Sequence, residues 1–177
     1  MRVTISGYPG AGKTTVGKLL ADRLGYKFYS VGDLRGKMAM ERGMTIDELN
    51  KVGEKEFWTD DMADQWQKKI GTTEDNFVME GRLSFYFIPD SVKLFLTIDP
   101  MAAAERVFKN QRPDEKPVSS VVEMKNLIHE RLEADRKRYQ EYYHIDPSAK
   151  ENFDLVIDTT NKDIPDVVSE IYNKIVL

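Results

Sequence analysis

The residues with the most evident chemistry lie close to the N-terminus, where the run from Gly7 to Thr14 fits the pattern G-x-x-x-x-G-K-[ST]. Glycines in such a turn let backbone N–H groups converge on a phosphate, and the N-terminus of a following helix adds partial positive charge. We expect Lys13 to bridge the β- and γ-phosphates of a nucleotide and the Thr14 hydroxyl to ligate Mg²⁺. The predicted nucleotide-binding residues are Gly7, Tyr8, Pro9, Gly10, Ala11, Gly12, Lys13, Thr14 and Thr15.

This phosphate-binding loop does not identify a reaction, because GTPases, motor ATPases and metabolite kinases share it. A GTPase would need the guanine-reading pattern N-K-x-D, and in Asn161-Lys162-Asp163 the acid comes one residue too early. The GTPase interpretation is therefore weakened. A glycine turn that binds no ligand is the remaining structural alternative.

A second group of polar residues is Glu80-Gly81-Arg82, which follows the apolar run 77–79. An acid at the carboxyl end of a buried strand lies where α/β sheets bind their ligands. We expect Glu80 to hold Mg²⁺, directly or through water, or to contact the acceptor. The planar guanidinium of Arg82 is suited to a phosphate. An ion pair that only stabilises the strand end is the alternative.

Arginines follow in a third region, around the Pro-containing break 111–119. Phosphoryl transfer depends mostly on in-line positioning and on neutralising charge, so arginines delivered by a closing lid suit it. Any one of them alone can equally be a solvated helix charge, and spacings of five and two residues prevent the last three from sharing one helix face. The arginines in question are Arg106, Arg112, Arg131, Arg136 and Arg138.

Hydrophobic periodicity predicts strands that alternate with helices, hence a three-layer α/β fold with a mainly parallel, five-stranded sheet. We expect a single domain, with the break 111–119 between two helices as a lid, and an ordinary surface loop as the alternative. The predicted strands are 2–6, 27–30, 77–80, 93–98 and 153–158. The predicted helices are 13–24, 58–70, 101–109, 120–143 and 164–175, with one more polar helical stretch that contains Met38, Met44, Ile46 and Leu49.

Charge and composition argue against several other classes of function. A net charge of -4 argues against strong nonspecific attraction to nucleic acid or anionic lipid. The sequence has no cysteine, which excludes thiol catalysis and fits a reducing cytoplasm, and we expect neither a membrane span nor a signal segment. His129 and His144 have no other metal ligands at useful spacing, so Mg²⁺ on the nucleotide is the expected metal.

Taken together, these motifs resemble the cytidylate kinase-like family, the short archaeal-type CMP kinases among the nucleoside monophosphate kinases. The resemblance covers essentially the whole length. The residues that carry it are Gly7 to Thr14, Tyr29-Ser30-Val31-Gly32-Asp33, Glu80-Gly81-Arg82, Ala104-Glu105-Arg106, Arg138-Tyr139, Tyr143-His144-Ile145-Asp146 and Leu155-Val156-Ile157-Asp158-Thr159.

The resemblance implies a P-loop NTPase fold with a core of residues 1–30, 77–110 and 150–177, a monophosphate-binding region 31–76 and a lid with flanking helix 120–143. It also implies that the donor adenine lies between Arg106 and the loop near Thr160 to Lys162. Substrate-binding roles are expected for Ser30, Gly32, Asp33, Arg35, Asp60, Asp64, Arg82 and Arg138, and catalytic roles for Lys13, Arg82, Arg112, Arg131 and Arg136.

One position departs from the family, because similar members usually carry arginine where Gly36 stands. The acceptor phosphate then lacks one clamp, which Arg35 or Lys37 could replace. Glycine also lowers helix propensity there by about 1 kcal/mol.

The sequence therefore predicts a cytoplasmic, monomeric kinase that uses ATP and Mg²⁺ to phosphorylate a nucleoside monophosphate, with CMP or dCMP as the favoured acceptor. Alternatives are a small-molecule kinase of the adenylate or shikimate type, a noncatalytic nucleotide-binding regulator, and a structural module with a vestigial loop. Base identity rests on the resemblance alone, since base reading depends on a few hydrogen bonds that spacing does not reveal.

Overall fold

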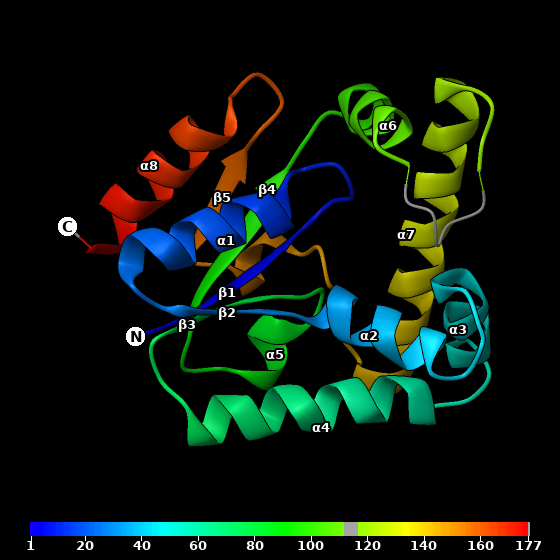
Figure 1. Cartoon of the computed structure of the whole chain (residues 1–177), viewed down its shortest axis with the longest axis horizontal. Helices are drawn as coiled ribbons and strands as arrows, with labels where there is room; N and C mark the ends of the chain where they lie inside the picture. Colours follow the sequence, from blue (N-terminus) through cyan, green and yellow to red (C-terminus); the bar gives the residue numbers. More distant parts are fainter. Residues whose placement is uncertain (112–116, 177) are drawn as a thin grey trace.

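The computed structural model describes residues 1–111 and 117–176 and contains a five-stranded parallel sheet in the order β2-β3-β1-β4-β5 (Figure 1). The strands are β1 (Arg2–Gly7), β2 (Lys27–Ser30), β3 (Phe77–Glu80), β4 (Val92–Thr97) and β5 (Leu155–Asp158). The prediction of a parallel five-stranded α/β sheet is confirmed, with β5 two residues shorter at its start than expected. The order brings the carboxyl ends of β1, β2 and β3 together.

The central strand β1 is buried on both faces, as is typical of parallel sheets covered by helices. Val3 and Ile5 have no exposed surface, and the polar side chains of Thr4 and Ser6 are also buried. Ser6 Oγ donates to the backbone carbonyl of Gly81 over 2.8 Å. This bond fixes the chain just after β3 beside the start of the phosphate-binding loop.

Helices cover both faces of the sheet. On one face α1 (Lys13–Leu24) and α8 (Ile164–Val176) share a core with β1, β3 and β4, with Leu20 and Ile171 fully buried. On the other face lie α4 (Trp58–Thr73) and α5 (Ser84–Phe87), where Ile70 and Ile88 pack on Phe77 and Met79. The long helix α7 (Val121–Tyr143) joins this side through Tyr139, and α6 (Pro100–Lys109) packs against α7.

The predicted helical stretch after β2 consists of two helices, α2 (Val31–Met40) and α3 (Ile46–Gly53). Gly43 interrupts it with a left-handed φ of 67°. A capping box then starts α3, because Thr45 Oγ1 accepts from the Glu48 N–H and the Glu48 carboxylate accepts from the Thr45 N–H. The sequence also gave no signal for α5, which has four residues, or for the short 3₁₀ turn Lys150–Asn152.

Among the described residues, no helix combines the length and apolar character needed to span a bilayer. The longest, α7, has 23 residues, but charged side chains recur along it.

Candidate active site

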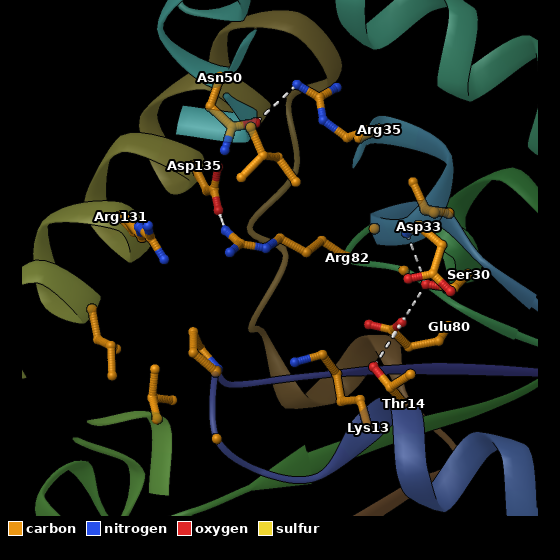
Figure 2. Close-up of a pocket in the computed structure, with 18 of the residues that line it drawn as sticks. Lys13, Thr14, Ser30, Asp33, Arg35, Asn50, Glu80, Arg82, Arg131 and Asp135 are labelled. Carbon is orange, nitrogen blue, oxygen red and sulfur yellow. Dashed lines mark hydrogen bonds and ion pairs between the residues drawn. The ribbon is translucent and has the colours of Figure 1, made fainter. Parts of the chain in front are cut away.

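A cavity of about 1280 Å³ opens at the carboxyl ends of β1, β2 and β3. The loop between β1 and α1 forms its floor, and α2, α3, α4, α6 and α7 surround it (Figures 1 and 2). This is where open α/β sheets bind ligands. Of the predicted site residues, those that line it are Pro9, Gly10, Gly12, Lys13, Thr14, Thr15, Ser30, Gly32, Asp33, Arg35, Asp60, Asp64, Glu80, Arg82, Arg106, Arg131 and Arg138.

The β1–α1 loop has the backbone that its glycines allow. Gly10 and Gly12 have left-handed φ values of 79° and 83°, and a Cβ on Gly10 would stand 2.9 Å from the carbonyl oxygen of Ala103. Lys13 begins α1, and its Nζ donates to the Tyr8 carbonyl over 2.9 Å. The ammonium therefore lies over the loop, with the N-terminal N–H groups of α1 beside it, which is a favourable setting for anionic phosphate.

Glu80 joins three segments at the floor of the cavity. Its Oε2 accepts from Ser30 Oγ over 2.9 Å and from Thr14 Oγ1 over 3.3 Å (Figure 2). Ser30 also caps α2 by accepting from the Asp33 N–H over 3.2 Å. The carboxylate at the end of β3 is thus held against the helix that carries Lys13.

The chemistry of this floor fits Mg²⁺. The ion prefers few protein oxygen ligands and completes its shell with water and phosphate oxygens. The Thr14 hydroxyl and the Glu80 carboxylate supply two such oxygens next to the phosphate-binding loop. Within residues 1–111 and 117–176 there is no group of three or more acidic or histidine side chains that would form a protein-only metal site.

The opposite wall carries a chain of alternating charges that runs Arg35, Asp60, Arg138, Asp135 and Arg82. Arg35 Nη1 lies 3.1 Å from Asp60 Oδ1, and Arg138 Nε lies 3.2 Å from Asp60 Oδ2. Arg138 Nη2 lies 3.0 Å from Asp135 Oδ1, and Asp135 also pairs with Arg82. Figure 2 shows Arg82 and Asp135 reaching across the cavity toward each other.

These ion pairs come from three helices and the loop after β3, and they are largely removed from water. Arg138 and Asp60 are 7% and 6% exposed at their side chains. Buried charges require partners because their desolvation is costly, and three arginines against two aspartates leave one positive charge in excess. The wall is therefore suited to an additional anion that faces the cavity.

Gly36 lies in α2, and a Cβ added to it would meet no atom within 4 Å. Its neighbour Arg35 points into the cavity, where Asn50 Oδ1 accepts from Arg35 Nη2 over 3.0 Å (Figure 2). Lys37 does not line the cavity. Of the two cations next to Gly36, Arg35 is the one placed to serve as a clamp.

The structure also places Arg106 between the phosphate-binding loop and the segment after β5. Its guanidinium donates to the carbonyls of Thr159 at 2.8 Å, Thr160 at 3.0 Å and Gly10 at 3.4 Å. This position agrees with the adenine-side location that the resemblance implies, and the role in adenine binding stays a prediction.

Several predicted residues lie elsewhere. Arg136 pairs with Asp146 at 3.3 Å and lines a smaller cavity of about 630 Å³ behind the loop, together with Gly7 and Tyr8. Ala11 is fully buried in the core. Arg112 lies outside the described residues. Arg131 and Arg136 line different cavities because a spacing of five residues on α7 places their side chains on different sides of the helix.

Sequence reasoning gave no site role to four polar residues of this region: Asp135, Gln67, Ser84 and Tyr143. Asp135 completes the charge chain, and Gln67 lines the cavity and accepts from Ser84 Oγ over 2.7 Å. Tyr143 donates to the carboxylate of Asp64. The signal for Gln67 was present, because positions 60, 64 and 67 recur on one face of a helix.

A model of the cytidylate kinase-like family matches residues 2–161 of the chain. A cytidylate kinase from Archaeoglobus fulgidus is 36% identical over 169 residues, which cover 95% of this chain and 91% of that protein. A cytidylate kinase from Methanocella arvoryzae is 35% identical over 175 residues, or 99% and 97% of the two chains. The crystal structure of shikimate kinase from Bacteroides thetaiotaomicron matches this chain with a TM-score of 0.69 at 16% sequence identity. The match covers 100% of this chain and 99% of that one, and it supports the fold alone.

Proposed function

Because the chain belongs to the cytidylate kinase-like family and is a nucleoside monophosphate kinase, we propose that it transfers the γ-phosphoryl group of ATP to CMP or dCMP. The products are ADP and CDP or dCDP. The observation that carries the proposal is the arrangement of one cavity with cationic side chains on two facing walls. The loop around Lys13 faces the arginine chain that ends at Arg35.

The donor side holds the triphosphate. Backbone N–H groups of the loop and the Lys13 ammonium would bind its β- and γ-phosphates. Thr14 and Glu80 would hold Mg²⁺, which when bound neutralises charge on the donor phosphates. Arg106 would lie beside the adenosine half, where its three carbonyl contacts keep it against Gly10 and Thr159.

The acceptor side binds the monophosphate. Arg35, Arg82 and Arg138 would surround its phosphate, because their excess positive charge is oriented toward the cavity by Asp60 and Asp135. An oxygen of that phosphate attacks the γ-phosphorus in line as the bond to ADP breaks, so positioning and charge neutralisation supply most of the catalysis. Arg131 lines the cavity between the two walls and would face the moving phosphoryl group (Figure 2).

An ADP-release assay with Mg-ATP and a panel of acceptors tests the proposal. The panel contains CMP, dCMP, UMP, AMP, GMP and shikimate. We expect CMP or dCMP to accelerate ADP release strongly, with values of kcat/KM at least tenfold above those of the other acceptors. No acceleration by any nucleoside monophosphate would overturn the kinase assignment, and preference for shikimate or AMP would overturn the acceptor.

A variant of the phosphate-binding lysine distinguishes turnover by this protein from turnover by a contaminating kinase. Lys13→Ala should remove the acceptor-dependent rate while leaving the melting temperature of the free protein close to that of the wild type. The cytoplasmic location, the monomeric state and the lid around residues 111–119 stay predictions.

A further inference from the structure

One face of α4 supplies both charged and uncharged polar groups to the cavity. Asp60, Ala63, Asp64 and Gln67 line it, at the spacing of successive turns. Asp60 organises the arginines, whereas Asp64 and Gln67 lie one and two turns further along the helix. The distance from Asp60 to Gln67 along the axis is roughly 10 Å, which is comparable to the reach of a nucleotide from phosphate to base.

Asp64 presents a hydrogen-bond acceptor to the cavity. Its side chain is buried, and Oδ2 accepts from the Tyr143 hydroxyl. The Tyr143 ring is held in place by Phe57 and Phe87, whose centroids lie 6.2 and 5.6 Å away. In the part of the chain that the structure describes, no hydrogen-bond partner contacts the other carboxylate oxygen, Oδ1. An ionised carboxylate can only accept, so this oxygen requires a donor from a ligand.

Gln67 presents a donor beside it. The residue is 3% exposed, and its Oε1 accepts from Ser84 Oγ over 2.7 Å. The bond from Ser84 turns the amide nitrogen away from that hydroxyl, and Nε2 has no hydrogen-bond partner among the described residues. A donor and an acceptor that are both buried and three residues apart on one helix face form a small recognition pattern.

We propose that Asp64 and Gln67 read the Watson–Crick edge of the acceptor base: Asp64 Oδ1 accepts from the exocyclic amino group of cytosine, and Gln67 Nε2 donates to the neighbouring ring nitrogen. The inference rests on the proposed function and adds the basis of its discrimination between cytosine and uracil. It gives Asp64 a specificity role, whereas the nearby Asp60 is a positioning residue for the arginines.

The same pair rejects uracil. Uracil carries a carbonyl in place of the amino group and an N–H in place of the bare ring nitrogen, so acceptor would face acceptor and donor would face donor. Leaving buried polar groups unpaired is costly, and sites that bind through such groups discriminate strongly against analogues that lack the matching partner. We expect the wild type to favour CMP over UMP by at least about 100-fold in kcat/KM.

The test exchanges the acceptor for a donor without changing the shape of the side chain. In Asp64→Asn the amide oxygen can still accept from Tyr143, which turns the NH₂ group toward the base. We expect kcat/KM for CMP to fall at least tenfold and that for UMP to rise, with KM for ATP unchanged. Asp64→Asn/Gln67→Glu inverts both groups, and we expect it to prefer UMP. Ser84 can still donate to the new carboxylate.

Asp61→Asn is the matched control, because Asp61 lies on the same helix outside the cavity and its carboxylate accepts from Gln65 over 3.3 Å. It should keep the wild-type ratio of CMP to UMP. Calorimetric titration with each monophosphate in the absence of ATP gives the same ratio from binding alone. Circular dichroism spectra and KM for ATP, both matching the wild type, establish that the variants are folded.

The outcomes separate the two proposals. A wild-type protein that phosphorylates no monophosphate overturns the proposed function. If the wild type prefers CMP but Asp64→Asn lowers the values for CMP and UMP by the same factor, Asp64 has only a structural role and the base-reading inference is overturned alone. A wild type that uses CMP and UMP equally overturns it as well.

Discussion

Arg138 Nε lies 3.2 Å from the carboxylate of Asp60, which joins the long helix α7 to α4 at the wall of the cavity. The other oxygen of the same carboxylate lies 3.1 Å from Arg35 on α2. One buried acid thus orients two arginines that are far apart in the sequence. Because these ion pairs are already formed, the acceptor phosphate that we propose for this wall would find the guanidinium groups in position.

Asp60→Asn should weaken the acceptor site without affecting the donor site. The variant keeps the size of the side chain but leaves Arg35 and Arg138 with less opposing charge in a buried setting. We expect KM for CMP to rise at least tenfold while KM for ATP stays within about twofold, and the free energy of unfolding to fall by about 3 kcal/mol. Steady-state kinetics and urea denaturation measure the two effects, and an unchanged KM for CMP would contradict the positioning role.

Lys13→Ala should act on the chemical step. The ammonium is held over the phosphate-binding loop by the Tyr8 carbonyl at 2.9 Å, and removing a preorganised charge of this kind typically costs about 10²–10³-fold in kcat. Lys18→Ala is the control on the same helix, because Lys18 stacks over Phe28 outside the cavity. A Lys13 variant that retains more than about a tenth of wild-type kcat would show that the loop amides alone carry the donor site.

Gly36→Ala should stabilise the protein. Gly36 lies within α2, has no left-handed φ, and a Cβ there meets no atom within 4 Å. Alanine is the better helix former, so we expect a gain of about 1 kcal/mol in the free energy of unfolding. Kinetic constants should be unchanged, since the phosphate clamp that we propose is Arg35 rather than residue 36. A loss of stability would show that α2 is strained in a way that the contacts do not reveal.

Gly10→Ala should destabilise the protein, in contrast to Gly36→Ala. The backbone there has a φ of 79°, and the new Cβ would stand 2.9 Å from a backbone oxygen of Ala103. The loop would have to shift, so we expect lower stability together with a raised KM for ATP. Equal effects of the Gly10 and Gly36 substitutions would contradict this distinction.

The sequence predicted the sheet well because each strand is a short segment with apolar residues, uninterrupted at Phe77 to Met79 in β3, and helix-forming segments separate most of the strands. Local spacing alone predicted the glycine turn between β1 and α1, and its role in binding the donor stays a prediction. Sequence reasoning missed the break before α3, although Gly43 and the spacing of Thr45 and Glu48 are a readable signal for the start of a new helix. Nor could it identify Asp135, which acts through an arginine more than fifty positions away.

The polar contacts of Asp64 and Gln67 were even harder to predict from the sequence. Helical spacing places Asp60, Asp64 and Gln67 on one face, but nothing in the sequence shows that Tyr143 and Ser84 each occupy one side of a polar group and leave the other side to the cavity. Such pairings depend on tertiary contacts between α4, α5 and α7. The base-reading roles proposed for Asp64 and Gln67 were therefore beyond sequence reasoning.

The raised pKa of Asp64 predicts how the stability of the protein depends on pH. Burial raises the pKa of the Asp64 carboxyl from the usual 3.8 to about 6, against the opposing effect of the Tyr143 hydrogen bond. The negative charge of Asp60 and Asp61 raises this pKa further, while Lys68 lowers it. The folded protein therefore binds a proton more tightly at this site than the unfolded chain does.

The sign of the effect follows from that difference. Between about pH 4 and pH 6 the folded state holds more protons at Asp64, so its contribution to the free energy of unfolding falls as the pH rises and stays unfavourable above pH 6. Asp64→Asn removes the ionisation. We expect the variant to be more stable than the wild type at pH 8 and the advantage to shrink to near zero below pH 4, with an upper limit of about 3 kcal/mol.

Urea denaturation of both proteins at several pH values between 4 and 8 measures this advantage. Exposed acids with shifted pKa values, such as Glu74 and Asp75, are common to both proteins and cancel in the difference. A difference that is constant across the range would mean that Asp64 titrates normally in the folded protein. A difference that grows with pH would mean that the chain keeps an ionised carboxylate at a cost in stability, which is reasonable where that carboxylate must accept a hydrogen bond from the substrate.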